Sequence, residues 1–324
     1  MASIPHITVL GSLNMDLVAY VPHHPLPGET LTATSSATSP GGKGANQAVA
    51  IAKLSRSAPS SPSALPADET ASVSMIGTIG RDAHGTALRS NLSSYGVQAD
   101  QLRVSDKSQT GVALIIVDEP TGENRIVLAP GANHDLLPDD VPAALGWGEK
   151  KPDLLVMQLE IPLPSVFAAL EAAKQAGVEV LLNPAPARPL PEAAYAGLGH
   201  LVVNETEAAL LGGVEVSELD TEEGMEKVAR GFVGRGVRNV VITLGGRGVY
   251  YMGEGGEKGL VGAEKAKVVD TTAAGDTFVG RYALDVVRGG VGIGEAVRRA
   301  NKAAARTVER KGAQDSIPWR DEVE

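Results

Sequence analysis

The sequence predicts an α/β protein with a doubly wound, mostly parallel sheet, helices on both faces and a small β-sheet lid. Apolar, β-branched runs bounded by glycine, proline or asparagine alternate along the chain with segments of helical periodicity. Such alternation is typical of a parallel sheet that is covered on both faces. Two further stretches alternate in hydrophobicity without an intervening helix, which indicates a separate β element.

The individual strands and helices can be expected in chain order. Six buried strands are predicted at 6–13, 72–80, 153–160, 178–184, 200–205 and 239–245. Helical patterns lie between them at 44–54, 84–96, 163–177 and 221–236. A later helix begins near Ala274, because Phe278, Tyr282 and Val286 recur every four residues and would share one buried face.

We expect residues 1–324 to form a single domain with two kinds of irregular addition. The lid segments are about 17–42 and 108–131, and "DEPTGEN" in the second segment indicates a hairpin turn. Residues 55–70 contain five serines and three prolines. This composition predicts a solvated loop inserted between a helix and a strand.

Composition excludes several classes of function. With 324 residues, 43% of them hydrophobic, the chain can build a substantial core. Its net charge of -10 and its aromatic content of 3% argue against a groove for nucleic acid. The absence of cysteine excludes disulfides and thiolate chemistry, and no apolar run approaches the ~18 residues that span a bilayer. We expect small soluble partners, no nucleic acid, no membrane and a cytoplasmic location, with a nuclear one left open.

The glycine-rich segment "GGKGAN" (41–46) is neither a Walker A loop nor a dinucleotide-binding motif. No serine or threonine follows Lys43, so a Walker A loop is excluded, and neither this segment nor "LGGRGV" has the G-x-G-x-x-G spacing. The glycines can be only a turn between strand and helix. Alternatively, Lys43, Asn46 and Gln47 at a helix start can donate hydrogen bonds to a hydroxylated ligand.

Two further segments allow a structural and a functional interpretation. In "VVNETEAALLGG", Asn204 and Glu207 have the spacing of a capping box, yet they also follow a strand, where open α/β sheets bind ligands. In "DTTAAGDTF" (270–278), Asp276 can be simply an acid in a first helical turn. It can also be a base that accepts the proton of a substrate hydroxyl, beside backbone N–H groups that small residues leave open to a phosphoryl group.

Seven segments in order carry a resemblance that covers essentially the whole chain: "GSLNMDLV", "GGKGANQAVAIAKL", "VMQLEIP", "VVNETEA", "TLGGRGV", "DTTAAGDTF" and "RKGAQDSIPW". The sequence resembles the ribokinase family, the PfkB-type carbohydrate and nucleoside kinases. Asn14, Asp16, Glu160 and the "AAGD" variant follow the pattern of the subfamily that acts on ribose.

The resemblance implies roles for named residues. Asp276 would be the catalytic base, and Gly275 and Ala274 would contribute backbone amides to an anion hole. The implied sugar-binding residues are Asn14, Asp16, Gly42, Lys43, Gly44, Asn46, Glu160 and Asp276. The implied ATP-binding residues are Asn204, Thr243, Leu244, Gly245, Gly246, Arg247, Gly248, Gly275 and Asn301.

The resemblance also implies metal ions and a reaction. Asn204 and Glu207 would hold Mg²⁺ through water, since Mg²⁺ dehydrates reluctantly. A K⁺ activator would be bound, partly through backbone carbonyls, by Asp270, Thr272, Thr307, Arg310, Gly312 and Ser316. The expected reaction is phosphorylation of D-ribose by ATP at the 5-hydroxyl, giving D-ribose 5-phosphate and ADP.

Two alternatives to this reaction stay open. One is a fructokinase-like or adenosine kinase-like enzyme, and the other is a sugar-binding sensor without catalysis. The low aromatic content disfavours a stacked purine as acceptor. The apolar "VALIIV" in the second lid segment would otherwise present an exposed strand edge, so we also expect a homodimer formed through the lid.

Overall fold

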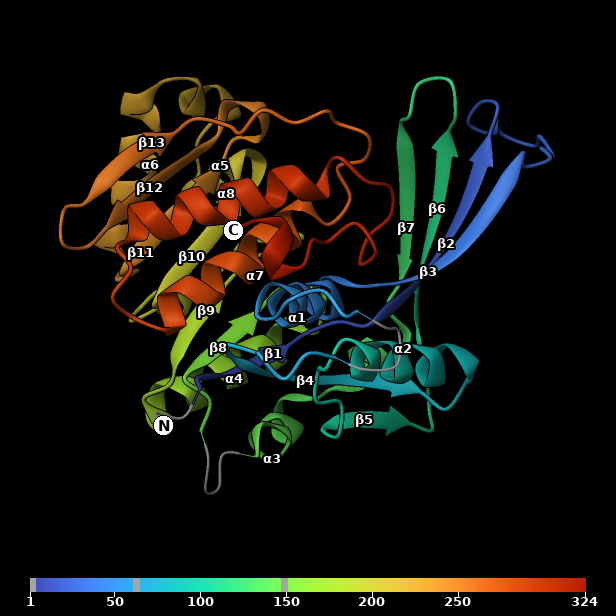
Figure 1. The fold of residues 1–324 in the computed structure, drawn as a ribbon, viewed down its shortest axis with the longest axis horizontal. Coiled ribbons are helices and arrows are strands. Elements are labelled where there is room, and N and C mark those ends of the chain that lie inside the picture. The colour runs from blue at the N-terminus through green and yellow to red at the C-terminus, as the bar shows by residue number, and fades with distance from the viewer. Residues whose placement is uncertain (1–3, 61–64, 147–150) are drawn as a thin grey trace.

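The computed structural model describes residues 4–60, 65–146 and 151–324 and contains a nine-stranded sheet (Figure 1). Its strands lie side by side in the order β13 (Lys258–Val261), β12 (Val249–Gly253), β11 (Asn239–Thr243), β10 (His200–Asn204), β9 (Glu179–Leu182), β8 (Leu154–Met157), β1 (His6–Leu10), β4 (Ser72–Gly80) and β5 (Leu102–Ser105). The strands from β5 to β11 run parallel, whereas β12 and β13 are antiparallel additions at one edge. The predicted doubly wound, mostly parallel sheet is confirmed.

Helices cover both faces of this sheet, as predicted. The first face packs against α1 (Lys43–Leu54), α2 (Ala83–Ser94), α7 (Ala274–Val287) and α8 (Ile293–Thr307). The second face packs against α3 (Val141–Leu145), α4 (Leu163–Ala176), α5 (Glu205–Gly212) and α6 (Glu222–Gly234). Side chains of a strand alternate between the two cores, so Val156 joins the first and Met157 the second. No described helix is long and apolar enough to cross a membrane.

The strand predicted over 6–13 is shorter than expected. It ends at Leu10, because the next residues turn beneath the first helix and the backbone carbonyl of Ser12 accepts a hydrogen bond from the backbone N–H of Ala45 at 2.9 Å. Asn14 then begins the next strand, which belongs to a different sheet. Polar side chains of the segment "GSLNMD" therefore lie where the two sheets join.

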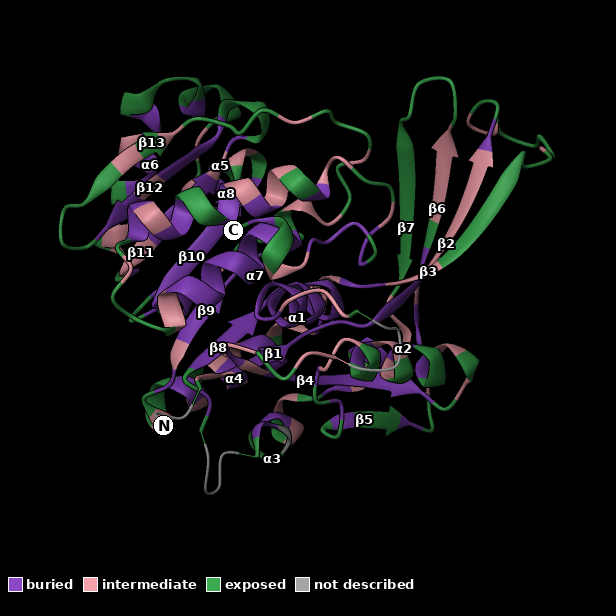
Figure 2. Ribbon diagram, in the orientation of Figure 1, coloured by how far each residue is buried: buried purple, intermediate pink, exposed green. Residues whose placement is uncertain are grey.

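A four-stranded sheet projects from the body (Figure 1). It consists of β3 (Ser35–Gly41), β2 (Asn14–Val21), β6 (Gly111–Asp118) and β7 (Asn124–Ala129) in that order. Strands β2 and β6 pair in parallel, and both outer pairs are antiparallel. Every residue of β7 is exposed, as the green strand in Figure 2 shows.

The serine- and proline-rich loop predicted at 55–70 lies partly outside the described residues, which omit 61–64. Its two ends are joined by Arg320 near the C-terminus. The guanidinium donates to the backbone carbonyls of Ser55 and Asp68 at 3.0 Å and to Ser57 Oγ at 3.0 Å. The C-terminal segment therefore holds the ends of the loop close together.

The contact between α1 and α7 depends on a glycine. A Cβ added to Gly280 would lie 2.6 Å from the Cβ of Ala50 and 3.0 Å from its carbonyl carbon, so the two backbones approach too closely for a larger residue. We expect Gly280→Ala to lower the free energy of unfolding by about 1–3 kcal/mol, because overpacking forces backbone shifts.

Denaturant unfolding monitored by circular dichroism checks this expectation, with Gly231→Ala in α6 as the matched control. A Cβ at Gly231 meets nothing within 4 Å, so that substitution should stabilise its helix by up to about 1 kcal/mol. Equal effects of the two substitutions would contradict the proposed close packing.

Candidate active site

Asp276 lies in the first turn of α7 and is 7% exposed. The residue before the helix, Ala273, has φ of 60°, a left-handed conformation that is strained for a residue other than glycine. Asn46 Nδ2 donates to Asp276 Oδ2 at 3.0 Å, and Gln47 Nε2 donates to Asp276 Oδ1 at 3.0 Å. The carboxylate therefore faces α1, and it does not cap its own helix in the part of the chain that is described.

The start of α7 leaves backbone N–H groups free. The amide of Ala274 donates to the carbonyl of Thr271 at 3.3 Å, and that of Thr277 donates to the carbonyl of Ala273 at 2.8 Å. Between them, the amides of Gly275 and Asp276 have no hydrogen-bond partner among the described residues. A Cβ at Gly275 would meet nothing within 4 Å. Open space and two free N–H groups at a helix start favour an anion there, so Gly275 and Asp276 fit the predicted anion hole better than Ala274.

The predicted sugar residues gather around Glu160, which follows β8. Its Oε2 accepts hydrogen bonds from Ser12 Oγ at 2.5 Å, from the backbone N–H of Lys43 at 3.1 Å and from Asn14 Nδ2 at 3.5 Å. One carboxylate oxygen thus joins the segment 12–14 and the start of α1 to the residue that follows β8.

Two glycines allow these segments to approach each other. Gly42 has φ of 88°, and a Cβ there would lie 2.7 Å from the backbone nitrogen of Asn14. A Cβ on Gly44 would lie 2.6 Å from the backbone nitrogen of Ser12. The pattern "GGKGAN" is therefore needed for close packing of α1 against the preceding strands, whether or not a ligand is bound.

Asn133 also belongs to this cluster and was not predicted. Its Nδ2 donates to Asn14 Oδ1 at 2.8 Å and to the backbone carbonyl of Leu13 at 3.0 Å, and its Oδ1 accepts from the Leu13 amide at 2.9 Å. These bonds fix the orientation of the Asn14 side chain. No local sequence pattern identifies Asn133, because its partners are more than a hundred residues away.

Acidic groups at the site perturb one another. Burial, followed by the charges of Glu160 and Asp276, raises the pKa of Asp16 to about 7. Burial lowers the pKa of Lys43, but the charges of Asp276, Glu160 and Glu207 outweigh it, so that this pKa lies above its usual value. Lys43 is therefore a cation among carboxylates, and Asp16 titrates near neutral pH. Such perturbed groups are concentrated at functional sites.

The pKa of Asp16 predicts a dependence of stability on pH. Because this pKa is higher in the folded protein, about 7, than in the unfolded chain, about 4, the folded state binds more protons between these values. Stability from this group is thus lost progressively as pH rises from about 4 to about 7. We expect Asp16→Asn to raise the melting temperature at pH 8.5 and to have much less effect at pH 4.5, as measured by scanning calorimetry without sugar. An equal change at both pH values would contradict the raised pKa.

Asn204 and Glu207 form the capping box of α5. Asn204 Oδ1 accepts from the backbone N–H of Glu207 at 2.8 Å, and Glu207 Oε2 accepts from the backbone N–H of Asn204 at 2.9 Å. The structural interpretation of this motif is therefore correct. Burial raises the pKa of Glu207. Its carboxylate interacts electrostatically with Lys43 and Asp276, and its Oε1 has no partner among the described residues, so it remains available to a hydrated Mg²⁺.

The other predicted ATP residues occupy the turn after β11 and one helix. Thr243 ends β11, and the turn contains Leu244, Gly245, Gly246, Arg247 and Gly248. The Arg247 side chain is committed to protein contacts, with Glu205 and with the backbone carbonyl of Leu219. Asn301 in α8 donates to the backbone carbonyl of Gly262 at 2.8 Å. These contacts hold the turn and α8 in place but leave the identity of a ligand open.

Part of the predicted K⁺ set is brought together. Asp270 accepts from the backbone N–H and hydroxyl of Thr272 at 2.9 and 2.6 Å, and from the backbone N–H of Gly312 at 2.9 Å. Thr307 Oγ1 donates to Thr277 Oγ1 in the first part of α7 at 2.9 Å. The side chains of Arg310 and Ser316 instead contact Glu322 and the carbonyl of Ala313. Asp270 thus links its own turn to Gly312, and Thr307 links α8 to the start of α7. No cluster of three or more acidic or histidine side chains suited to a metal exists within the described ranges.

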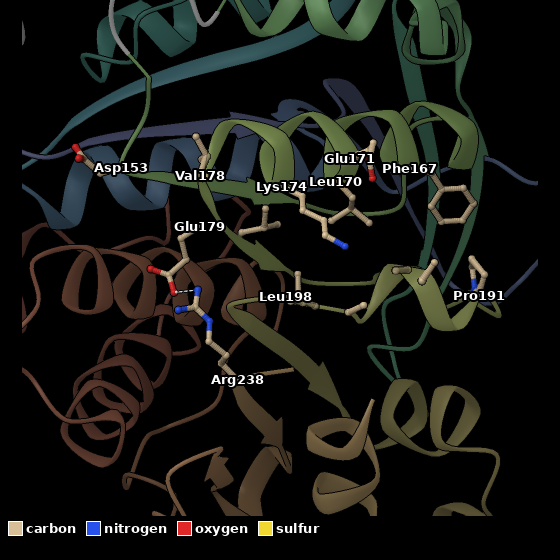
Figure 3. Close-up of a pocket in the computed structure, with 16 residues that line it drawn as sticks. Asp153, Phe167, Leu170, Glu171, Lys174, Val178, Glu179, Pro191, Leu198 and Arg238 are labelled. Atoms are coloured by element: carbon tan, nitrogen blue, oxygen red, sulfur yellow. Dashed lines mark hydrogen bonds and ion pairs between the residues drawn. The ribbon is translucent and has the colours of Figure 1, made fainter. Parts of the chain in front are cut away.

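One pocket lies away from this site, between α4 and the amino ends of β9 and β10 (Figure 3). Leu170 and Leu198 contribute apolar surface, and Glu179 accepts a hydrogen bond from Arg238 at 2.7 Å beside them. None of the predicted site residues lines it. Open α/β sheets bind ligands at the carboxyl ends of their strands, where Asn204 and Asp276 are found instead.

The fold and the site together define the class of protein. Residues 5–320 match the pfkB family of carbohydrate kinases. The chain belongs to this family.

Three relatives indicate which branch of the family this chain is similar to. The ribokinase of Schizosaccharomyces pombe is 44% identical over 98% of this chain and 96% of that protein. A structure of Arabidopsis thaliana ribokinase complexed with ribose and ATP superposes with a TM-score of 0.85 at 31% identity, covering 99% of this chain and 98% of that chain. A deoxyribokinase from Salmonella typhi is 37% identical over 96% of this chain and 95% of that protein.

Proposed function

We propose that this protein is an ATP-dependent kinase that phosphorylates D-ribose at its 5-hydroxyl, giving D-ribose 5-phosphate and ADP. One observation carries the proposal most directly: the carboxylate of Asp276 is oriented by α1, beside two free backbone amides. The relatives support ribose as the sugar substrate, since a ribokinase is 44% identical to this chain over nearly its full length. The proposed location is the cytoplasm, where ATP is available.

The residues of the chain supply binding, proton transfer and charge stabilisation. Asn14, Asp16, Lys43 and Glu160 provide donors and acceptors for sugar hydroxyls, which must be paired when water is displaced. Asp276 accepts the proton of the 5-hydroxyl as the oxygen attacks the γ-phosphorus of ATP. The amides of Gly275 and Asp276 donate to the phosphoryl oxygens, where negative charge is concentrated during transfer.

The family resemblance implies Mg²⁺ and K⁺, and each ion can be assigned to named residues. Mg²⁺ bound to ATP would be held through water by Glu207, whose second carboxylate oxygen is free of the capping box. K⁺ would lie beside the loop that Asp270 organises, and its charge would favour phosphate at the start of α7. Both assignments are supported by the donor groups described above and are part of the proposal.

Turnover of a panel of acceptors tests the proposed substrate. Ribose, deoxyribose, fructose and adenosine are compared by ADP release with MgATP, with and without K⁺. We expect ribose to give the highest kcat/KM and K⁺ to increase it. Equal or better turnover on another acceptor would overturn the choice of ribose, and ribose binding without any ADP release would favour a sugar sensor. Deoxyribose is the most informative competitor, because one relative is a deoxyribokinase.

We propose that a second copy of this chain covers the small sheet. Large apolar side chains are exposed on it, among them Leu114 (48%) and Val127 (63%), which are paired across β6 and β7 and therefore point to the same face. Sedimentation equilibrium at micromolar concentration should give twice the chain mass, and Val127→Lys on this face should shift the protein toward the monomer. A monomeric mass for the unmodified protein would refute the dimer.

A further inference from the structure

Two fully buried glutamines lie behind Asp276 and have no role in the proposed reaction so far. Gln47 on α1 and Gln158 just after β8 are both 0% exposed. Gln47 Nε2 donates to Asp276 Oδ1 and to Asn183 Oδ1, each at 3.0 Å. Its Oε1 accepts from Gln158 Nε2 at 2.6 Å. The base is therefore the end of a chain of side-chain amides inside the protein.

The bond from Gln158 to Gln47 and the bond from Gln47 to Asp276 both donate in the direction of the carboxylate. Asn183 cannot turn around freely, because its Nδ2 donates to the backbone carbonyl of Val202 at 2.9 Å. An ionised carboxylate only accepts hydrogen bonds, so Gln47 must present its NH₂ group to Asp276 and its carbonyl to Gln158. Gln158 must then present its own NH₂ group to Gln47.

This arrangement of amides has an unfavourable consequence at Gln158, the glutamine farther from Asp276. Gln158 Oε1 is buried and has no hydrogen-bond partner among the described residues. It lies so close to Gly11 that a Cβ there would be 2.0 Å from it. Turning the Gln158 amide would bring two carbonyl oxygens together, and turning Gln47 as well would place a carbonyl against the carboxylate of Asp276. The unpaired oxygen is therefore explained by the negative charge of the base, although such a group ordinarily destabilises a fold.

We propose that Gln47 is a positioning residue for Asp276, with its direction set by Gln158 and Asn183. Gln47 and Asn46, which are consecutive in α1, each occupy one carboxylate oxygen and prevent rotation of the group. The remaining lone pairs then face the acceptor hydroxyl. This inference rests on the proposed role of Asp276 as base.

The test is a double-mutant cycle of Gln47→Met, which has nearly the same volume, and Asp276→Asn. Alone, Gln47→Met should lower kcat by about 10- to 100-fold, because a misplaced catalytic group costs up to about that much. The Kd for ribose, measured by calorimetry, should change by less than about threefold, since uniform binding is not affected. In the Asp276→Asn background the same substitution should lower kcat by less than about threefold, because its partner is already lost.

Thr78→Val in β4 is the matched control for removing a buried polar group, since Thr78 Oγ1 is buried without a partner among the described residues. It should leave kcat and the melting temperature nearly unchanged. Gln158→Met should give a smaller loss of kcat than Gln47→Met. Losses of kcat that multiply independently in the cycle would overturn the positioning role, as would a Gln47→Met protein with normal kcat. If Asp276 is not the catalytic base, Asp276→Asn alone would show near-normal turnover. This result distinguishes an error in the proposed function from an error in the positioning role.

Discussion

Asp276→Asn is expected to lower kcat by about 10²- to 10⁴-fold, the usual loss when a positioned base is removed. The amide cannot accept the proton of the 5-hydroxyl. It also has an NH₂ group in place of one oxygen, although both oxygens of Asp276 now accept hydrogen bonds, from Asn46 and Gln47. Initial rates of ADP release at saturating ribose and MgATP measure the loss. ATP affinity, measured by calorimetry, should stay nearly unchanged because the free amides are retained.

The matched control is another acid in a first helical turn. Glu222→Gln at the exposed start of α6 removes a charge that has no hydrogen bond or ion pair among the described residues and that favours the helix dipole by about 0.3–1 kcal/mol. Its turnover should be normal. Should Asp276→Asn behave like Glu222→Gln, Asp276 would be only a favourable charge at a helix start.

Glu160→Gln is expected to have the largest effect on sugar binding. Three donors converge on Glu160 Oε2, from Ser12, Asn14 and the backbone of Lys43. An amide nitrogen at this position would meet donors, and an amide oxygen would carry less charge for them and for a sugar hydroxyl. Hydrogen bonds to charged groups are worth about 1.5–3 kcal/mol, so we expect the Kd for ribose to rise by about 10- to 100-fold.

Two measurements separate this effect from unfolding. The KM for ATP should be nearly unchanged, and the melting temperature should remain well above the assay temperature. Glu171→Gln on the exposed side of α4 is a control for the loss of one negative charge and should bind ribose normally. Normal ribose affinity of Glu160→Gln would remove Glu160 from the sugar site.

The sequence predicted the central fold because its signals are local. Runs such as "NVVITLG" and the periodicity after Ala274 specify elements that the structure confirms, and the alternation of strands and helices specifies their layers. The antiparallel strands β12 and β13 were not anticipated. The edge strand β13 is short and contains Lys and Gly, which is a weak pattern, and β12 follows β11 after only the turn at 244–248, without an intervening helix. Strand ends, such as that of β1 at Leu10, depend on tertiary contacts and were placed too late.

The site was predictable only in part, for the same reason. Family motifs identify Asp276, Asn46 and Glu160, and the structure joins them through hydrogen bonds and electrostatic interactions. Asn133 and Gln158 act through partners that are distant in sequence, so no motif reveals their roles. In the predicted anion hole, the amide of Ala274 is occupied and, among the described residues, that of Gly275 is free. This difference depends on backbone hydrogen bonds, which residue types do not determine.

A crystal structure with ribose and a non-hydrolysable ATP analogue tests the central claim most directly. The decisive quantity is the distance between the carboxylate of Asp276 and the 5-oxygen of ribose. We predict about 2.6–3.2 Å, the range for direct proton transfer, with the γ-phosphate against the amides of Gly275 and Asp276. A carboxylate turned away from the sugar, with its oxygens accepting hydrogen bonds from the first turn of α7, would contradict the proposed chemistry.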